Sequence, residues 1–305
     1  MTVGVREEAM NKLGVHALVW VGGWSHEECA KAIGQTAALG YDLIEIPALD
    51  PKSIDVDFTR RTLEQNKLGV TMSLGLDAAS DISSGDPDKI TRGEALLLDA
   101  LRVARDIGGT HVCGILYSAF QKYFIPPTEK GIQGSIDAIR RFCGEAAKSN
   151  ITIGMEVVNR YESNVLNTAA QAVDFCKRVG ATNIKVHLDT YHMHIEEADI
   201  EAAIVQTGSM LGYFHIGESN RGYLGAGSLD FDRVFRGLAK AEYKGPITFE
   251  SFSSAVVNQP LSGILAIWRN LWTDGRDLAG HAKDFIETGL KAAQEAHARS
   301  KVGLQ

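Results

Sequence analysis

The sequence predicts an α/β protein built as one closed (β/α)8 barrel. Eight short runs rich in β-branched and aromatic residues recur along the chain, and a longer stretch with helical periodicity follows each run. The 305 residues fit eight such units, and no linker rich in proline, glycine or serine divides them. We therefore expect residues 1–12 to form an N-terminal tail and residues 13–305 a single barrel domain with a C-terminal helix.

The elements alternate between strand and helix throughout. Ser25 precedes a helical stretch as a candidate N-cap and Gly40 stands just past its end, and Thr168 and Gly180 have the same places around a later stretch. The predicted strands, in chain order, are LGVHAL from Leu13, YDLIEIP from Tyr41, GVTMSLGL from Gly69, THVCGILYS from Thr110, ITIGMEVVN from Ile151, IKVHLDTYH from Ile184, LGYFHIGES from Leu211 and PITFESF from Pro246.

A doubly wound open sheet is the alternative fold. Such a sheet normally carries a glycine-rich nucleotide loop after an early strand. Neither G-x-G-x-x-G nor G-x-x-x-x-G-K-[ST] occurs in this sequence. The closed barrel is therefore the preferred prediction.

Composition excludes several classes of function. Lysine and arginine number 31 against 38 acidic residues, and the net charge of −7 disfavours nucleic-acid binding, which depends on surplus basic residues. No apolar run approaches the length of a membrane span, so we expect no membrane partner. The four cysteines form no C-x-x-C pair, which favours neither a disulfide framework nor a zinc site and indicates a reducing cytoplasm.

Four ionisable residues stand where strand residues should be apolar. Glu156, Asp189, His215 and Glu250 lie past the middle of the last four predicted strands, each beside apolar neighbours. In a barrel such positions line the C-terminal mouth, where active sites form. Any one of them alone is more simply explained by a salt bridge, a cap or a buried histidine. Their joint occurrence predicts that one divalent cation satisfies all four.

The donor set indicates which cation to expect. Three carboxylates and one imidazole suit Mn²⁺, Co²⁺ or Mg²⁺ better than the thiolate-rich sites typical of Zn²⁺. Manganese is the first expectation.

Other polar and aromatic residues are candidates for contact with substrate. Glu162, His192 and Arg221 follow the strands that carry the four ionisable residues. Strand alternation predicts that His192 and Asp189 face opposite sides. Trp268 and Trp272, spaced i and i+4, predict a packed helix face or a subunit contact.

On these residues the sequence resembles the ketose 3-epimerases, the D-tagatose 3-epimerase family within the xylose-isomerase-like barrels. Two further stretches, GYLGAGSLDFD and IWRNLW, resemble the branch described as L-ribulose 3-epimerase or D-allulose (D-psicose) 3-epimerase. The likeness covers the chain from Leu13 to the last helix and is carried by EVVNRYES (156–163), HLDTYHMHIEE (187–197), FHIGESNRG (214–222) and FESF (249–252).

The resemblance implies a metal held by Glu156, Asp189, His215 and Glu250. It also implies a free ketose as substrate and self-association into a homodimer or homotetramer. His16 and Ser73 stand where other members carry an aromatic residue and a cysteine, and Ser251 replaces a proline. The substrate contacts expected from the resemblance and its aromatic mouth are Glu162, His192, Arg221, Trp24, His16, Phe120 and Phe252.

The chemistry of C3 inversion explains why two glutamates are needed. A proton is removed beside the C2 carbonyl, a cis-enediolate forms, and a proton returns to the opposite face. We expect Glu156 and Glu250, on the fifth and eighth strands, to serve as the two catalytic groups while also binding the metal.

Three alternatives remain open. A metal-dependent 1,2-aldose-ketose isomerase of the same superfamily uses a similar ligand set and is second. A DNA hydrolase of the apurinic endonuclease type would need more histidine ligands, several zinc ions and a basic face. A non-catalytic sugar-binding barrel would not need paired glutamates on opposing strands.

Overall fold

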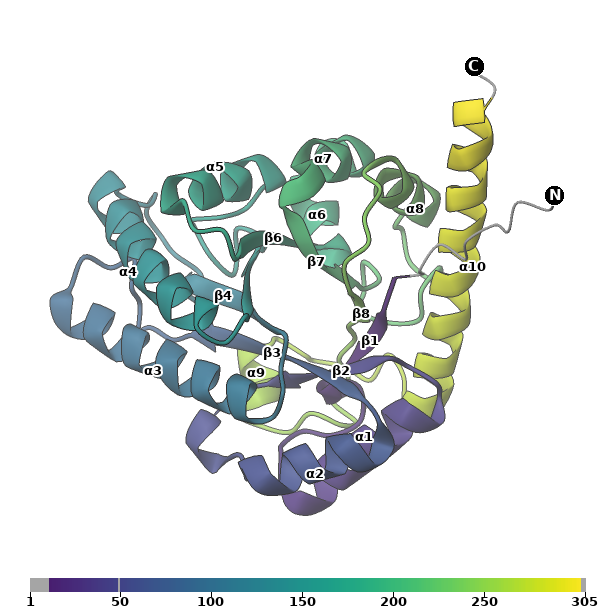
Figure 1. Cartoon of the computed structure of the whole chain (residues 1–305), viewed down its shortest axis with the longest axis horizontal. Helices are drawn as coiled ribbons and strands as arrows, with labels where there is room; N and C mark the ends of the chain where they lie inside the picture. The colour runs from purple at the N-terminus through teal and green to yellow at the C-terminus, as the bar shows by residue number, and fades with distance from the viewer. Residues whose placement is uncertain (1–10, 49, 303–305) are drawn as a thin grey trace.

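The computed structural model describes residues 11–48 and 50–302, and it forms a closed barrel of parallel strands (Figure 1). Each strand pairs in parallel with the next, and β8 pairs with β1 to close the barrel. This arrangement confirms the predicted fold class. The strands are β1 (Leu13–His16), β2 (Leu43–Pro47), β3 (Gly69–Leu76), β4 (His111–Ala119), β5 (Thr152–Glu156), β6 (Ile184–Asp189), β7 (Leu211–Ile216) and β8 (Ile247–Phe249).

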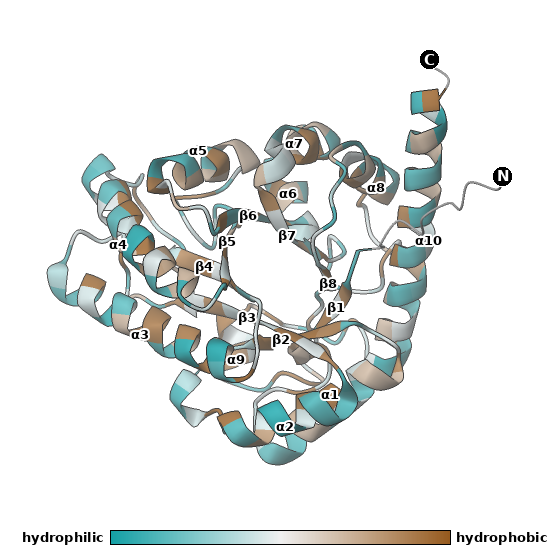
Figure 2. Ribbon diagram, viewed as in Figure 1, coloured by the Kyte–Doolittle hydropathy of each residue, from teal (hydrophilic) through white to brown (hydrophobic). Residues whose placement is uncertain are grey.

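Most of the helices surround the barrel (Figure 1). In Figure 2 apolar residues mark β2 and β4, whereas the outer sides of α2 and α10 are largely hydrophilic. The helices are α1 (His26–Ala38), α2 (Val56–Asn66), α3 (Pro87–Asp106), α4 (Glu129–Ala147), α5 (Ala169–Val179), α6 (Thr190–Glu196), α7 (Ile200–Thr207), α8 (Phe231–Lys240), α9 (Leu261–Ile264) and α10 (Gly275–Val302), with short 3-10 turns η1 (Ala17–Val19), η2 (Pro51–Ser53) and η3 (Gly208–Met210).

The predicted helix caps are confirmed. Ser25 and Thr168 each accept a hydrogen bond from the backbone in the first turn of α1 and α5, and both take part in capping boxes. Gly40 and Gly180 follow the same two helices with φ of 72° and 73°, the left-handed region that glycine adopts without strain.

The sixth strand ends earlier than its sequence pattern predicts. The run IKVHLDTYH was expected to remain extended to His192, but β6 stops at Asp189 and α6 begins at Thr190. The side chain of Asp189 caps this helix by accepting a hydrogen bond from the backbone N–H of Tyr191 at 2.7 Å. His192 therefore lies in the first turn of a helix.

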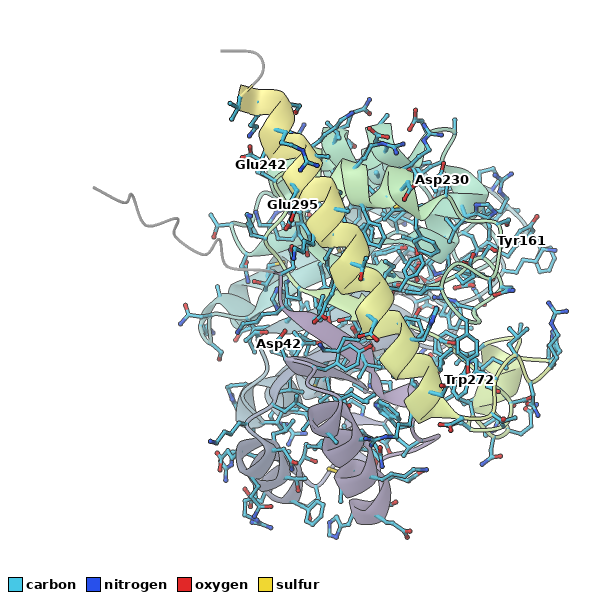
Figure 3. All side chains as sticks on the ribbon, turned by 90° about the vertical axis from the view of Figure 1, so that its right-hand side faces the viewer. Asp42, Tyr161, Asp230, Glu242, Trp272 and Glu295 are labelled. Atoms are coloured by element: carbon cyan, nitrogen blue, oxygen red, sulfur yellow. The ribbon has the colours of Figure 1, made fainter. Side chains whose placement is uncertain are left out.

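The first described residue, Asn11, is hydrogen-bonded to the barrel, and the last helix packs on its outside. The side-chain amide of Asn11 donates to the backbone carbonyls of Tyr243 and Gly245, at 3.0 and 2.9 Å. Residues 1–10 of the predicted tail lie outside the described residues. The predicted C-terminal helix is α10, which runs along the outside of the barrel from near Trp272 to near Glu242 (Figure 3).

Two further observations concern the cysteines and the hydropathy of the helices. All four cysteines are buried with free thiols, so none forms a disulfide. Within the described residues, none of the helices has the length and hydropathy of a membrane-spanning segment.

Candidate active site

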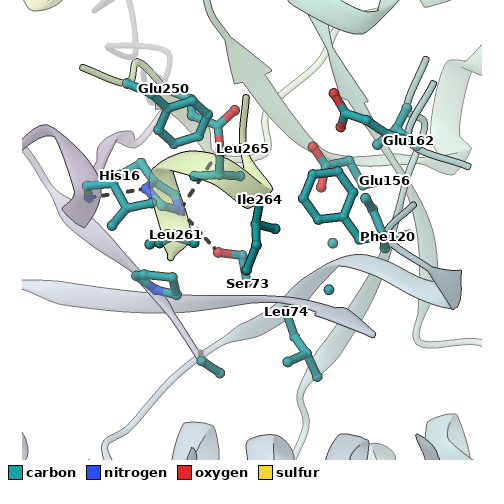
Figure 4. A pocket seen from close by; sticks show the side chains of 18 of the residues that line it. His16, Ser73, Leu74, Phe120, Glu156, Glu162, Glu250, Leu261, Ile264 and Leu265 are labelled. Atoms are coloured by element: carbon teal, nitrogen blue, oxygen red, sulfur yellow. Dashed lines mark hydrogen bonds and ion pairs between the residues drawn. The ribbon is translucent and has the colours of Figure 1, made fainter. Parts of the chain in front are cut away.

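A cavity of ≈ 350 Å³ opens at the carboxyl ends of the strands (Figure 4). One part of its wall is polar and includes His16, Ser73 and Glu156. Another part is apolar and includes Phe120 and Ile264. A polar wall beside an apolar one is typical of a site that orients a small molecule by a few hydrogen bonds.

The four ionisable residues predicted as metal ligands converge here. Glu156 and Asp189 are the last residues of β5 and β6, His215 is the penultimate residue of β7, and Glu250 directly follows β8. The Nδ1 atom of His215 lies 3.7 Å from Glu156 Oε1, 3.9 Å from Asp189 Oδ2 and 3.6 Å from Glu250 Oε1. The closed barrel thus brings together residues from four successive strands.

This cluster fits a divalent cation. Two ligands bound to one ion at about 2.1 Å can be at most about 4.2 Å apart, and the separations around His215 fall inside that limit. Asp189 Oδ2 and His215 Nδ1 are buried atoms without a hydrogen-bond partner among the described residues. A cation would satisfy both atoms and neutralise carboxylates that otherwise repel each other.

Arg221 neutralises part of the same cluster from the side of the β7–α8 loop. Its guanidinium lies 2.7 Å from Glu250 Oε2 and 3.2 Å from Asp189 Oδ2. The guanidinium also stacks on the ring of Tyr191, 4.1 Å from the centroid. The backbone of Arg221 has a positive φ of 60°, an uncommon conformation for a residue with a Cβ atom.

His192 joins the cluster, contrary to the prediction from strand alternation. Its Nε2 atom lies 3.7 Å from Asp189 Oδ2, because α6 turns the chain back toward the cavity. The backbone N–H of Asn159 donates to its Nδ1 atom at 3.1 Å. The proton of the neutral ring is then on Nε2, so His192 faces the cavity as a hydrogen-bond donor rather than as a ligand.

The other predicted substrate contacts divide into two groups. The cavity wall includes His16, Phe120, Glu162 and Phe252. Trp24 does not belong to the lining of this cavity, because its indole N–H turns away to donate to Thr59 Oγ1 at 3.1 Å. Its predicted contact with substrate therefore has no support from this geometry.

Trp268 and Trp272 do not share a helix face. The helical spacing was misleading because α9 ends at Ile264, and the segment up to α10 is irregular. Trp268 is 73 % exposed and lines a second hollow that shares Phe120 and Phe252 with the cavity, whereas Trp272 is buried. The indole N–H of Trp272 donates to Ser251 Oγ at 2.7 Å, and the Ser251 hydroxyl donates to the backbone carbonyl of Arg221.

One buried carboxylate close to the cluster was not predicted from the sequence. Glu45 lies in the middle of β2 and is fully buried. Its Oε2 atom lies 2.7 Å from His215 Nε2 and accepts a hydrogen bond from the Tyr213 hydroxyl at 2.8 Å. The signal was the same as for the four predicted ligands, an ionisable residue with apolar neighbours in a strand, here Ile44 and Ile46.

The two predicted catalytic glutamates have different electrostatic surroundings. Burial raises the pKa of Glu156 to about 7. Burial also acts to raise the pKa of Glu250, but the positive charges of Arg221 and His215 outweigh it and hold that pKa below its ordinary value. Burial likewise raises the pKa of Glu162, at the cavity mouth, to about 7.

Comparison with known proteins places this site in a family. Residues 33–289 match the family described as xylose isomerase-like TIM barrel. The chain is 46% identical over 281 residues to the ketose 3-epimerase of Arthrobacter globiformis, covering 92% of this chain and 97% of that protein. It is 47% identical over 274 residues to the L-ribulose 3-epimerase of Methylomonas sp. strain DH-1, covering 90% of this chain and 96% of that one.

The solved structures agree with the sequence comparison. The crystal structure of a D-allulose 3-epimerase from Methylomonas sp. in complex with D-allulose superposes with a TM-score of 0.90 at 46% identity, covering 92% of this chain and 98% of that one. The barrel fold and these relatives define an enzyme of the isomerase class. The chain belongs to the ketose 3-epimerases of the xylose isomerase-like TIM barrel family.

Proposed function

We propose that this chain is a metal-dependent epimerase that inverts C3 of free ketoses by transferring protons through two carboxylates. The observation that carries the proposal is the convergence of Glu156 from β5 and Glu250 from β8 on one point, 3.7 and 3.6 Å from His215 Nδ1. The names of the relatives at 41–47% identity support the reaction class.

Glu156, Asp189, His215 and Glu250 would hold the metal. A bound divalent cation supplies a Lewis acid that stabilises the negative charge developing on the substrate oxygens. The oxygen-rich donor set favours Mn²⁺, with Co²⁺ and Mg²⁺ as alternatives.

The opposite pKa shifts suggest how the two carboxylates divide the work. Glu250, beside Arg221, is the carboxylate that remains ionised and can accept the C3 proton. Burial favours the protonated form of Glu156 in the metal-free protein, whereas a bound cation would lower that pKa, so Glu156 would take up a proton during turnover and return it to the opposite face. For the other epimer the two roles exchange.

Neighbouring side chains orient the sugar. The Nε2–H groups of His16 and His192 and the guanidinium of Arg221 are donors for sugar hydroxyls, and Glu162 is an acceptor while ionised. Phe120 and Phe252 form apolar walls that exclude water from the reacting carbon.

Free ketose pairs such as D-fructose and D-allulose, or L-ribulose and L-xylulose, are the proposed substrates. The net charge of −7 supports the proposal that the protein ignores nucleic acids. We also propose a cytoplasmic location and assembly into a homodimer or homotetramer.

The proposal is tested by product analysis. The protein is freed of metal by chelation, reloaded with Mn²⁺, Co²⁺ or Mg²⁺, and incubated with D-fructose, D-allulose, D-tagatose or L-ribulose. Chromatography should find the C3 epimer, best with Mn²⁺ or Co²⁺. Aldoses as the main products would favour the 1,2-isomerase instead, and full activity in protein shown by elemental analysis to be metal-free would refute metal dependence.

A further inference from the structure

Glu45 is a fully buried acidic residue in the second strand of the barrel. In the sheet it is paired with His16 on one side and Thr71 on the other. The wall of the cavity, as described above, does not include Glu45. A substrate in that cavity would therefore not touch Glu45, and its role must be sought in the groups that surround it.

The surroundings of Glu45 are built to keep a carboxylate in place. Its Oε2 atom accepts from the Tyr213 hydroxyl at 2.8 Å, and that hydroxyl lies 2.7 Å from both Thr71 Oγ1 and Thr248 Oγ1. Strands β2, β3, β7 and β8 thus each contribute one side chain to the network. Because a buried charge without partners is costly, these hydrogen bonds stabilise Glu45 in its ionised form.

The contact with His215 fixes what that ring can do. The 2.7 Å separation between Glu45 Oε2 and His215 Nε2 is a short, charge-assisted hydrogen bond in which the ring donates. With its Nε2 proton held by Glu45, the ring presents Nδ1 to Glu156, Asp189 and Glu250. The ring of His187 stands edge-on to the His215 ring, with centroids 4.2 Å apart, and limits its rotation.

We propose that Glu45 is a positioning residue that holds His215 with Nδ1 directed at the metal site and so raises the affinity of that site for a divalent cation. This inference rests on the proposed function, because it assumes that His215 is a metal ligand. A histidine ligand that donates its second N–H to a carboxylate is oriented and made more basic by it.

Glu45 is not itself a ligand of the cavity metal or of a second ion. Together with His16 and Glu250 it forms a group whose donor atoms lie within 4.8 Å of one another. However, the backbone N–H of Leu18 donates to His16 Nδ1 at 3.2 Å, which leaves the proton of the neutral ring on Nε2. Nε2 is the His16 atom that faces Glu45 and Glu250. Because it carries the proton, it has no lone pair with which to bind an ion between them.

The test is calorimetric titration of Mn²⁺ into metal-free protein, with no sugar present. Glu45→Gln keeps the shape of the side chain but removes its charge, and Tyr213→Phe keeps Glu45 but removes one of its donors. The matched control is Asp81→Asn, which alters another buried carboxylate that accepts from a tyrosine hydroxyl, that of Tyr123 at 2.7 Å.

We expect Glu45→Gln to weaken Mn²⁺ binding about 10- to 100-fold, and Tyr213→Phe to weaken it less. Asp81→Asn should lower thermal stability but leave the Mn²⁺ affinity unchanged. The rise in melting temperature on adding Mn²⁺ should shrink in Glu45→Gln and persist in Asp81→Asn.

Three results would overturn the inference. One is a folded Glu45→Gln variant with wild-type Mn²⁺ affinity. Another, decisive if Glu45→Gln does not fold, is wild-type affinity in Tyr213→Phe. The third is a wild-type stoichiometry of two ions per chain with one lost in Glu45→Gln. Wild-type protein that binds no Mn²⁺ would instead refute the metal dependence of the proposed function.

Discussion

Glu156 and Glu250 are both buried, yet their charged neighbours differ. Both lie beside His215 Nδ1, at 3.7 and 3.6 Å, but Glu250 also pairs with Arg221 at 2.7 Å. The same cavity therefore favours the charged form of one carboxyl and the neutral form of the other. An enzyme that must both remove and deliver a proton needs this asymmetry.

Each glutamate should be indispensable for epimerisation. Glu156→Gln and Glu250→Gln keep an oxygen that binds metal weakly but remove the proton-transfer group, so kcat should fall by ~10²–10⁴. Steady-state kinetics at saturating Mn²⁺ checks this. Asp81→Asn is the control, because Asp81 is a buried carboxylate that does not belong to the cavity lining. Loss of only a few-fold in either catalytic variant would contradict the assignment.

Metal binding should depend on pH through Glu156. Its pKa is raised to about 7 by burial, so below that pH a proton competes with the cation. The carboxylates of Glu45 and Glu250 also raise the pKa of His215 despite its burial, so its Nδ1 must lose a proton as well. Mn²⁺ affinity should therefore rise with pH by up to about tenfold per unit for each displaced proton, and the rise should become less steep above about pH 7, where Glu156 is already ionised.

Calorimetry at pH 5.5, 6.5 and 7.5, in buffers of different ionisation enthalpy, measures both the affinity and the protons released. Glu162→Gln should retain this dependence, because Glu162 is not one of the proposed ligands. A pH-independent affinity in the wild-type protein would show that Glu156 does not need to lose a proton for metal binding.

The sequence predicted the order and number of the strands better than the residues at which they end. Alternation of strand and helix gave all eight strands, because each carries a compact apolar run. The end of β6 was missed, since the side chain of Asp189 starts a helix where the apolar pattern continues. The Trp268 and Trp272 spacing looked helical, but the chain there is irregular, and spacing alone cannot reveal this.

The candidate site was predictable to the extent that its residues interrupt apolar strands. Glu156, Asp189, His215 and Glu250 gave that signal, and Glu45 gave it too. Contacts made by loops were harder to predict, because they depend on how distant segments fold back. The clearest case is the hydrogen bond from Trp272 to Ser251. Through the Ser251 hydroxyl it connects the segment before α10 to Arg221 in the β7–α8 loop.

The contact between Trp272 and Ser251 predicts an effect on substrate affinity. Trp272→Phe removes the indole N–H that holds Ser251, and Ser251 in turn holds the backbone of Arg221. One lost hydrogen bond of about 1 kcal/mol corresponds to roughly a fivefold rise in KM, with a smaller change in kcat.

Trp20→Phe is the matched control. Trp20 is also a buried indole whose N–H donates to a hydroxyl, that of Thr36 at 2.9 Å, but the lining of the cavity does not include it. It should lower stability without raising KM. Equal KM values in the two variants would mean that Trp272 acts only through stability.

At the scale of the whole molecule, exposed apolar side chains remain around the barrel mouth and on a neighbouring loop. Trp268 and Ile264 are 73 % and 58 % exposed, and Phe124 is 89 % exposed. Aromatic residues of this kind are enriched at protein interfaces. We predict that light scattering will find two or four copies of the 33.1 kDa chain. A 33 kDa particle at high protein concentration would refute self-association.

Proton exchange at C3 through Glu156 on β5 and Glu250 after β8 can be followed with an isotope. The most direct test is to turn over a ketose in D₂O and locate the deuterium in the recovered sugar by nuclear magnetic resonance. A proton taken by Glu250 has no direct path to the opposite face, so deuterium should appear at C3 after each inversion. Label at C1 or C2 would indicate a 1,2-isomerase, and unlabelled C3 after many turnovers would contradict the two-carboxylate mechanism.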